Sequence, residues 1–427
     1  MAGLSILFLA STLPRFVDDR QAPFVLEQAQ AWKASRPDDR VIILAPHDPA
    51  AARRESIGDV EIRRFQYFVP SRLQTLAYPA ILPNLKRNPL RAVQIAPFLW
   101  AEYAAARRIV REEGVELVYA HWVMPQGVVA RWLSRSTGVP YIVQNHSSDL
   151  SVFSKAGSLG RAAARAIIRD AQRMFCVNHR QKDDALGLFA ASSRTRVAEK
   201  ITVLPMGVGM DVTAVRPTKA GAASPRYALA TISRLSRKKG IDLLIAAAER
   251  MAENGRVVPI GIAGDGEDRD ALTAMPRRAN ITFPGFLSGA DKIDFFNDTR
   301  FMAFPSVSAG ADVEGLPVAL LEALCCGKIV IAGPDTNVAM LDEWEQISQG
   351  VILLNDPRNV DEFVTAIERL LDLDQMVLAD RSEHLRKVLA RYRWENLIGE
   401  YLAAIEPERI TDQHVSQDRK SATRFSY

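Results

Sequence analysis

The sequence has few of the features that mark a disulfide-stabilised, metal-binding or membrane-spanning protein. Its three cysteines fit neither metal-ligand nor disulfide spacing; they are Cys176, Cys325 and Cys326. We expect buried thiols in a reducing compartment, and hence a cytoplasmic protein. No stretch has the ~18 uninterrupted apolar residues of a spanning helix. The apolar run at residues 4–9 follows no Lys or Arg, so it predicts a first buried strand rather than a signal peptide.

The charge is unevenly distributed, although the net charge is only +4. Residues 1–215 hold 28 Lys/Arg and 19 Asp/Glu, a balance of +9, and the remainder holds 26 and 31, a balance of −5. A basic first half suits anionic lipid headgroups or a phosphorylated substrate. Because no nucleic-acid-binding motif accompanies it, we expect no nucleic-acid partner.

Strands and helices alternate along the chain in two series, without internal sequence repeats. In the first half, the predicted strands are 5–10, 40–45, 117–120, 141–144 and 174–177, and the predicted helices are 19–35, 98–113, 127–138 and 159–172. In the second half, the strands are 228–232, 258–263, 281–283, 301–304, 329–332 and 351–354, and the helices are 240–253, 267–274, 291–299, 317–326, 359–372 and 376–404. This order predicts an α/β protein of two Rossmann-like, doubly wound domains that face a central cleft.

The composition also predicts domain limits. Residues 1–212 and 227–390 are the two domains, and 213–226, rich in Pro, Gly, Ala and Ser, is the linker between them. Residues 391–410 predict a C-terminal helix that packs back toward the first domain. The polar tail, 411–427, is expected to be disordered.

The most informative segment, residues 314–322, places two carboxylates around the start of one helix. Pro317 lacks an N–H and has a pre-set φ, which suits the first helical position. Glu314 then precedes the helix, and Glu322 lies about 7–8 Å further along at ~1.5 Å per residue. The free N–H groups around Gly315 and Leu316 can receive an anion.

One class of ligand meets all these requirements, namely a nucleotide diphospho-sugar. Glu314 would bind sugar hydroxyls, the helix start the diphosphate, and Glu322 the ribose. The alternative is an amphipathic helix with two solvated glutamates.

A second segment, residues 233–242, supplies the cations that a diphosphate requires. Arg234 and Lys239 lie five residues apart across a turn and can clamp a charge that backbone amides neutralise incompletely. The same groups would stabilise charge on the departing nucleotide. Arg237 and Lys238 fit a solvated basic loop.

These segments resemble glycosyltransferase family four, whose members have the GT-B fold and retain anomeric configuration. Residues 314–322 match its E-x7-E signature, and Arg234, Lys239 and Gly240 match R-x4-K-G. The resemblance implies a hexosyltransferase of bacterial cell-surface polysaccharide biosynthesis. Its donor would be a nucleotide-diphosphate sugar bound by domain 227–390, and its glycan or lipid-linked acceptor would face domain 1–212. It also implies front-face attack assisted by the donor phosphate, without a covalent nucleophile.

Three further positions follow from the resemblance. Gly264 and Gly266 follow a strand and would let the backbone approach the nucleotide closely, while Phe286 would lie beside the base.

Residues 268–270, Asp-Arg-Asp, match a metal motif of another glycosyltransferase fold. They open a predicted helix, so we interpret them as a helix N-terminal charge pattern and expect no essential metal or other cofactor.

The first half contributes His146, which would contact the donor sugar or lie near the acceptor, and His121, for which a structural role is favoured. Segments 121–127 and 144–149 resemble bacterial family members that build exopolysaccharides. Two departures put phosphate or donor contacts in doubt, because Ser147 and Ala22 stand where the family has glycine. The turn at 204–208 is interpreted as structural.

A basic stripe recurs every four residues on one predicted helix. Its members are Arg161, Arg165, Arg169 and Arg173, and with Lys86, Arg87, Arg91, Phe98 and Trp100 they would hold the protein to an anionic inner leaflet. An ordinary solvated helix face is an equally good interpretation.

Two other functions stay open at this point. A sugar-nucleotide epimerase shares the architecture but needs no acceptor. A non-catalytic subunit would bind a nucleotide sugar within a polysaccharide assembly complex. The motifs do not define the sugar, the base, the acceptor or the linkage.

Overall fold

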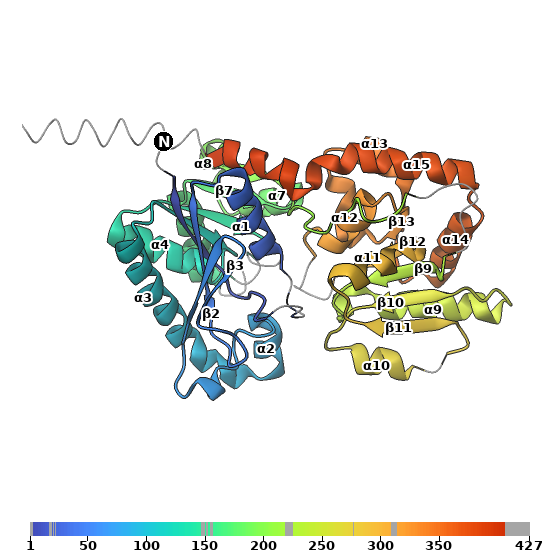
Figure 1. Ribbon diagram of the computed structural model, residues 1–427, viewed down its shortest axis with the longest axis horizontal. Helices are drawn as coiled ribbons and strands as arrows, with labels where there is room; N and C mark the ends of the chain where they lie inside the picture. Colours follow the sequence, from blue (N-terminus) through green and yellow to red (C-terminus); the bar gives the residue numbers. More distant parts are fainter. Residues whose placement is uncertain are drawn as a thin grey trace, which may run out of the picture.

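The computed structural model describes residues 3–16, 19, 21, 23–146, 150, 153, 157–217, 225–275, 277–308 and 314–405. Two lobes lie side by side, the first built from the blue and green parts of the chain and the second from the yellow and orange parts (Figure 1). Ala22, Ser147 and the tail 411–427 lie outside the described residues, so the expectations placed on them remain predictions.

The first lobe holds an eight-stranded sheet in the order β3-β4-β2-β1-β5-β6-β7-β8. Its strands are β1 (Ser5–Leu9), β2 (Arg40–Pro46), β3 (Arg54–Ile57), β4 (Val60–Phe65), β5 (Leu117–His121), β6 (Tyr141–Asn145), β7 (Arg173–Cys176) and β8 (Ile201–Val203). All neighbours pair in parallel except β3 and β4, which form an antiparallel edge. The surrounding helices are α1 (Phe24–Ser35), α2 (Ile81–Arg87), α3 (Ile95–Glu113), α4 (Gln126–Thr137), α6 (Gly157–Asp170), α7 (His179–Gly187) and α8 (Ala191–Ala198), with 3-10 turns η1 (Ser71–Leu73) and η2 (Pro89–Gln94).

The second lobe holds a six-stranded parallel sheet in the order β11-β10-β9-β12-β13-β14. Its strands are β9 (Tyr227–Ile232), β10 (Ile260–Ala263), β11 (Ile281–Gly285), β12 (Thr299–Phe304), β13 (Val330–Ala332) and β14 (Val351–Leu353). Its helices are α9 (Ile241–Glu253), α10 (Arg269–Ala274), α11 (Gly289–Asn297), α12 (Val318–Cys325), α13 (Trp344–Ile347), α14 (Val360–Leu371) and α15 (Gln375–Val388). Short 3-10 turns are η3 (Arg237–Lys239), η4 (Pro334–Thr336), η5 (Val338–Met340), η6 (Ser348–Gly350) and η7 (Leu389–Tyr392).

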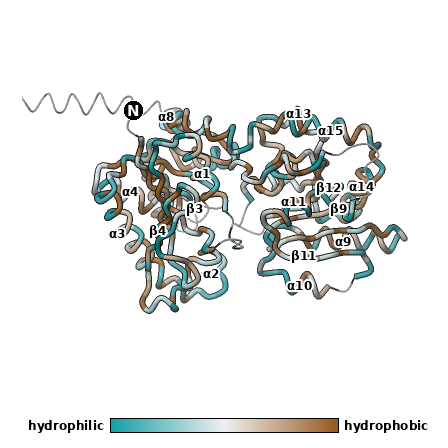
Figure 2. Tube along the Cα trace, viewed as in Figure 1, coloured by the Kyte–Doolittle hydropathy of each residue, from teal (hydrophilic) through white to brown (hydrophobic). Residues whose placement is uncertain are grey.

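The strands lie where continuous apolar runs predict them. Because helices cover both faces of each sheet, the strands are buried on both sides and contain few polar residues. Figure 2 shows this as brown strands at the centre of both lobes. The prediction of two parallel, doubly wound sheets is therefore confirmed, apart from the antiparallel edge.

Several boundaries differ from the prediction. The helix expected from residue 19 begins at Phe24, directly after Pro23. The helical region expected over 376–404 is interrupted by η7 and by Arg393 in an extended conformation, after which residues 394–405 are helical. The strands β3, β4 and β8 and the helices α2, α7, α8 and α13 were not predicted.

The helix over 394–405 returns to the first lobe. The Tyr401 hydroxyl donates to the carbonyls of Leu204 and Pro205, each at 3.0 Å, and its ring centroid lies 4.8 Å from that of Phe175. The Val208 amide donates to the Tyr392 carbonyl at 2.8 Å. The two lobes are thus joined by two chain crossings, one near residue 215 and one near residue 390.

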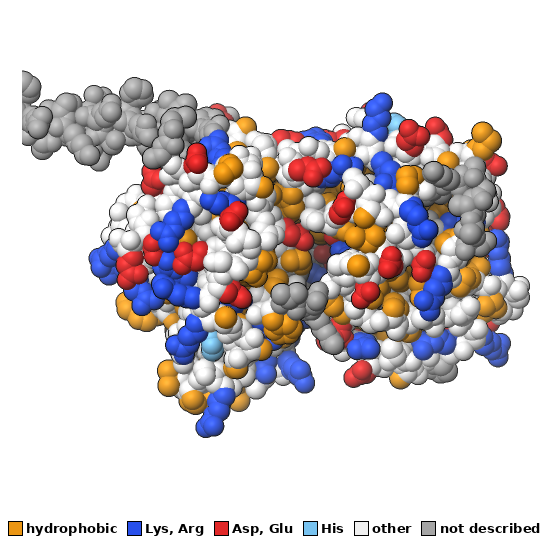
Figure 3. All heavy atoms as spheres, viewed as in Figure 1, with side chains coloured by type: hydrophobic (Ala, Val, Ile, Leu, Met, Phe, Trp, Pro, Cys, Tyr) orange, Lys and Arg blue, Asp and Glu red, His pale blue; other side chains and the backbone are white. Residues whose placement is uncertain are grey.

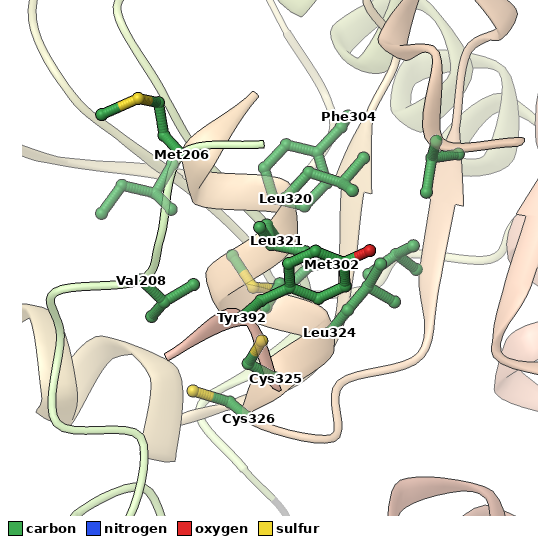
Figure 4. Close-up of a cluster of buried hydrophobic side chains, with 14 of the residues drawn as sticks. Met206, Val208, Met302, Phe304, Leu320, Leu321, Leu324, Cys325, Cys326 and Tyr392 are labelled. Atoms are coloured by element: carbon green, nitrogen blue, oxygen red, sulfur yellow. The ribbon is translucent and has the colours of Figure 1, made fainter. Parts of the chain in front are cut away.

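Helix α12 is enclosed by apolar side chains from both parts of the chain. Leu320, Leu321 and Leu324 pack among Met302 and Phe304 of β12, the ring of Tyr392, and the segment that holds Met206 and Val208 (Figure 4). The cysteines of this cluster and Cys176 are free and buried, as predicted. Within the described residues, no helix has both the length and the apolar composition to cross a bilayer.

Candidate active site

The loops after β9 and β12 meet at the point where the strand order of the second sheet reverses. The chain runs from β9 outward to β10 and β11, then returns to β12 on the other side of β9. In doubly wound sheets, the loops that diverge at such a point form the ligand crevice. The first loop carries Lys239 and the second leads to Glu314.

Lys239 and Glu314 form an ion pair at this crevice. The Lys239 ammonium lies 2.8 Å from Glu314 Oε2, and the ammonium of Lys238 lies 3.9 Å from the same oxygen. The side chains of Lys239 and Glu314 are 13% and 12% exposed, so neither is a freely solvated surface charge. Lys238 was expected to be solvated, but it also approaches the carboxylate.

Close packing of the two loops sets this geometry. Gly240 has φ +64°, and a Cβ there would lie 2.2 Å from the carbonyl oxygen of Pro305. The Val307 amide donates to the Lys238 carbonyl at 2.8 Å. Only a glycine lets the backbone after Lys239 turn in this way against the end of β12.

Arg234 has a different partner from Lys239. Its guanidinium pairs with Glu267 at 3.0 Å and is 40% exposed. The structure therefore brings Lys239 and Glu314 together. Arg234, in the loop after β9, instead pairs with Glu267 in the neighbouring loop, after β10. The role of Arg234 as a diphosphate ligand stays a prediction.

Gly264 and Gly266 contact protein backbone. A Cβ at Gly264, whose φ is +128°, would lie 1.8 Å from the Ser233 carbonyl oxygen, and one at Gly266 would lie 2.2 Å from that of Leu235. These glycines therefore let the loop after β10 pack onto the loop after β9. This packing explains their presence next to Arg234, and the close approach of a nucleotide to these glycines stays a prediction.

Phe286 follows β11 directly and is half-buried. It is absent from the described apolar residues that pack against the core, whereas its neighbours Phe283 and Leu287 belong to them. Phe286 is therefore not one of the described residues packed against the core, and its contact with a base stays a prediction.

The backbone before α12 is fixed from both lobes. The Gly315 carbonyl accepts from Asn337 Nδ2 at 2.7 Å and, across the crevice, from Asn178 Nδ2 at 3.0 Å. Asn337 also donates to the Glu314 carbonyl at 3.0 Å. Pro317 is buried at the N-cap position, one residue before the helix, and Leu316 is half-buried. This places Glu314 at the mouth of the crevice, ahead of the helix as predicted.

His146 belongs to a ring cluster at the end of β6. Its ring stacks on His121 with centroids 5.3 Å apart, and the two nitrogens Nε2 and Nδ1 lie 3.1 Å from each other. Phe24 and Trp122 lie against its other sides, with centroids 4.9 and 4.8 Å away. Burial lowers the pKa of His146 to about 3, so the ring is neutral at physiological pH and acts as a hydrogen-bonding aromatic, not as a cation.

His121 lies deeper in the same cluster and is fully buried. Burial, with a smaller contribution from His146, lowers its pKa well below the usual value. Its stacking on Phe8 and Tyr119 supports the structural interpretation.

The backbone of His146 also faces the second lobe, because a Cβ at Gly315 would lie 2.4 Å from the His146 carbonyl oxygen.

Glu322 is buried and pairs with Lys292 of α11 at 2.6 Å. Glu27 of α1, in the first lobe, is close enough for Glu322 to influence its titration. Burial, followed by the charge of Glu322, raises the pKa of Glu27 to about 7, and Lys292 partly offsets this. Glu322 thus lies at the junction of the lobes, and a ribose contact would require it to share or leave Lys292.

Sequence reasoning missed Asn178, Asn337 and Lys292. Asn178 had a local signal, because it follows β7 and caps α7 by accepting from the Gln181 amide at 2.9 Å. Its partner Gly315 is 137 residues away in the chain, a pairing that no local pattern predicts. Asn337 has a positive φ of 56°, which is common for asparagine in turns.

The Asp-Arg-Asp segment lies at the start of α10, with Asp268 at the N-cap position, as expected. Among the described residues, no group of three His, Cys, Asp or Glu side chains is arranged to hold a metal ion. Independence from metal stays a prediction.

Comparisons with known proteins identify the class of protein to which this fold and this site belong, namely the glycosyltransferases. A family model described as glycosyl transferases group 1 matches residues 216–387, and one described as glycosyl transferase 4-like domain matches residues 21–207. The solved structure of HepE from Anabaena, crystallised with UDP and glucose, is 17% identical. It covers 94% of this chain and 99% of its own, with a TM-score of 0.63. The catalytic domain of starch synthase IV from Arabidopsis thaliana, bound to ADP and acarbose, is 12% identical with a TM-score of 0.64, over 94% of this chain and 98% of that domain. The fold is thus GT-B.

Curated relatives complete the comparison. WcaL of Escherichia coli, assigned as a colanic acid biosynthesis glycosyltransferase, is 30% identical over 183 residues, 42% of this chain and 44% of its own length. TuaC of Bacillus subtilis, assigned to teichuronic acid biosynthesis, is 26% identical over 261 residues, 60% of this chain and 61% of its own. The matches span about half the length of these relatives. The chain belongs to the GT-B glycosyltransferases of the family-four type.

Proposed function

We propose that this protein transfers a sugar, with retention, from a nucleotide-diphosphate donor to a glycan or lipid-linked acceptor in bacterial surface polysaccharide synthesis. The observation that carries the proposal is the ion pair of Lys239 and Glu314 at the switch point of the second sheet. A cation and a carboxylate held together there suit a ligand with a charged diphosphate next to uncharged hydroxyls.

In this proposal each group has one task. Lys239 and Arg234 neutralise the diphosphate, Glu314 and the backbone of residues 315–317 orient the sugar, and Glu322 binds the ribose. Gly264, Gly266 and Phe286 shape the nucleotide side. His146, neutral at physiological pH, donates or accepts a hydrogen bond at the sugar or acceptor.

The reaction breaks the bond between the anomeric carbon and the donor phosphate oxygen. The acceptor oxygen bonds to the same face of that carbon, and its proton passes to the departing phosphate. Retention and front-face attack follow from the family resemblance. Charge that develops on the leaving diphosphate is greatest in the transition state, so cations fixed at this point lower the barrier.

The test first identifies the donor and then removes the pair. A thermal-shift panel of nucleoside diphosphates and their sugars selects the donor, because a bound ligand stabilises the folded state by mass action. We expect Lys239→Ala and Glu314→Ala each to lower transfer by about 10²-fold or more, with unchanged circular dichroism. Arg250→Ala and Glu253→Ala are matched controls, since these residues form an exposed ion pair on α9, 3.5 Å apart.

Wild-type rates in both Lys239→Ala and Glu314→Ala would contradict the proposal. The same assay separates the alternatives. Product that forms only when acceptor is added excludes an epimerase, and any transfer or donor hydrolysis by the isolated protein excludes a non-catalytic subunit. We also propose that no metal is required, so activity should persist in EDTA.

A further inference from the structure

One segment of the first lobe carries no negative charge. Residues 62–101 contain no Asp or Glu, but contain six Lys or Arg residues: Arg63, Arg64, Arg72, Lys86, Arg87 and Arg91. The next carboxyl, Glu102, is buried, and burial raises its pKa to about 8. Arg63 and Arg64 form ion pairs with Glu61, Glu113 and Glu55, so the positive character of this end of the lobe comes from Arg72, Lys86, Arg87 and Arg91.

The same segment exposes large apolar side chains. Leu90, Val93 and Trp100 are 77%, 68% and 66% exposed. With Val69, Leu73 and Leu82, which are also exposed, they form what we call the tip surface, at the lower end of the first lobe, around α2. Figure 3 shows orange and blue side chains together at this end of the lobe. Exposed apolar groups gathered in one place indicate an interaction site.

Buried amides hold this surface in place. Asn84 of α2 donates to the carbonyls of Leu76 and Tyr78 at 2.9 and 2.8 Å, and accepts from Arg91 at 2.8 Å. Gln94 donates to the Leu73 carbonyl at 3.0 Å and so ties η2 to η1. The apolar side chains are therefore presented by an ordered platform.

The side chains change in character along α3, away from the tip surface. Trp100 and Tyr103 come first, with ring centroids 5.7 Å apart, followed by Arg107 and Arg111 on the same helix face. With Ala104 and the ion-paired Arg108 and Glu112, they line a groove of about 420 Å³. Leu90 and Val93 precede the helix in η2, and within α3 the step from Trp100 to Arg111 extends over roughly 16 Å at ~1.5 Å per residue.

We propose that the tip surface docks on an anionic lipid bilayer. Apolar side chains at the end of the lobe enter the acyl boundary, aromatic rings lie at the interface, and arginines lie at the level of the lipid phosphates. This order of residue types matches the depth profile of a membrane interface. Several short elements contribute single apolar side chains, which suits a fluid surface better than the fitted surface of a protein partner.

This places the contact elsewhere than the arginine stripe, whose members Arg161, Arg165 and Arg169 lie on α6. Arg173, predicted on the same helix, begins β7 instead. Arg165 donates to the Leu188 carbonyl at 3.3 Å and Arg173 to the Glu199 carbonyl at 2.7 Å, so both are engaged within the protein. Arg169 pairs with Asp170 at 3.0 Å. Phe98, which we expected beside the stripe, is buried.

The test measures co-sedimentation of the full chain with vesicles, and needs neither donor nor acceptor, so its result is independent of the transfer assay. One set is phosphatidylcholine alone, and the other contains about one third phosphatidylglycerol. We expect binding to the anionic vesicles, weakened by high salt through screening. The double variant Leu90→Glu with Val93→Glu should weaken it about tenfold or more, because both charges would enter the apolar boundary.

Two matched variants complete the design. Met376→Glu changes a 75% exposed side chain on α15, in the second lobe, and should leave vesicle binding unchanged. Leu159→Glu changes an 83% exposed side chain on α6, beside the stripe, and should also leave it unchanged. No binding of the wild type to anionic vesicles would overturn the proposal. So would a loss in Leu159→Glu or Met376→Glu as large as in the double variant.

Discussion

At the scale of single residues, the site depends on charges whose partners lie in distant parts of the chain. Glu314 pairs with Lys239 from another loop, and Glu322 pairs with Lys292 from another helix. For Glu27, the positive charge of Lys292 does not offset the effects of burial and of the nearby Glu322 charge, which together raise its pKa. Glu27 and Glu322 meet where the two lobes join, so the protonation of Glu27 is linked to the arrangement of the lobes.

Replacing Glu27 by glutamine should stabilise the protein at alkaline pH. The pKa of Glu27 is raised from 4.5 to about 7, so between these values the folded state binds more protons than the unfolded state. The contribution is complete below pH 4.5 and is lost as the pH rises through 7. At ~1.4 kcal/mol per pKa unit, the shift from 4.5 to about 7 predicts that Glu27→Gln is more stable than wild type by about 3–4 kcal/mol at pH 8, and similar at pH 4.5.

Denaturant unfolding at a series of pH values checks this expectation. Glu253→Gln, at an exposed position of α9, serves as the control and should follow the wild-type curve. If the curves of wild type and Glu27→Gln run parallel across the pH range, the assignment of this titration to Glu27 is wrong.

At the scale of helices and strands, the fold follows largely from local sequence. Continuous apolar runs predicted the central strands to within two residues, because strands covered on both faces have no polar side to disguise them. The edge strand β3 and its neighbour β4 were missed because charged residues interrupt their apolar runs. Their hairpin had a signal in Gly58-Asp59, a two-residue turn in which Gly58 has φ +59°.

The site was predictable to the extent that its motifs are linear. Glu314 and Lys239 each lie in a segment whose residue order defines a turn or a helix start. The ion pair between them, and the amides of Asn178 and Asn337 that fix Gly315, depend on how separate loops pack. No pattern in a single stretch of sequence contains that information.

The loop after β10 permits a direct test of packing. In Gly264→Ala the new Cβ would lie 1.8 Å from the Ser233 carbonyl, at a φ of +128°. We expect the free energy of unfolding to fall by about 2–4 kcal/mol, the sum of backbone strain and overpacking. Gly399→Ala, in the helix over 394–405, meets nothing within 4 Å and should raise it by up to ~1 kcal/mol. Equal effects of the two substitutions in thermal or denaturant unfolding would refute this account of the loop.

At the scale of the whole molecule, the lobes contact one another through backbone at the mouth of the crevice. Gly315 lies against the His146 carbonyl and is held by Asn178, and nearby His179 pairs with Asp342 at 3.0 Å. The contacts around Gly315 are buried, so they define how closely the lobes approach. Interfaces within a chain of this kind commonly allow relative motion of the domains.

Gly315→Ala should hold the lobes apart. Its Cβ would lie 2.4 Å from the His146 carbonyl oxygen and 3.0 Å from Val177 Cγ2, which closure of the lobes cannot accommodate. We expect a larger radius of gyration in solution scattering and a loss of transfer of about tenfold or more, with each lobe still folded. Gly187→Ala in α7, with nothing within 4 Å, should match wild type in both measurements. An unchanged radius and rate in Gly315→Ala would show that the lobes do not need this approach.

The return of residues 394–405 to the first lobe has a consequence for biosynthesis. Tyr401 completes the packing of Phe175 and satisfies the carbonyls of Leu204 and Pro205, yet it leaves the ribosome nearly 200 residues after them. At a synthesis rate of about 5–20 residues per second, the first lobe therefore waits on the order of 10–40 s for its last helix. During that interval a part of its apolar surface is uncovered, and the nascent chain offers chaperones a binding site that the finished protein lacks.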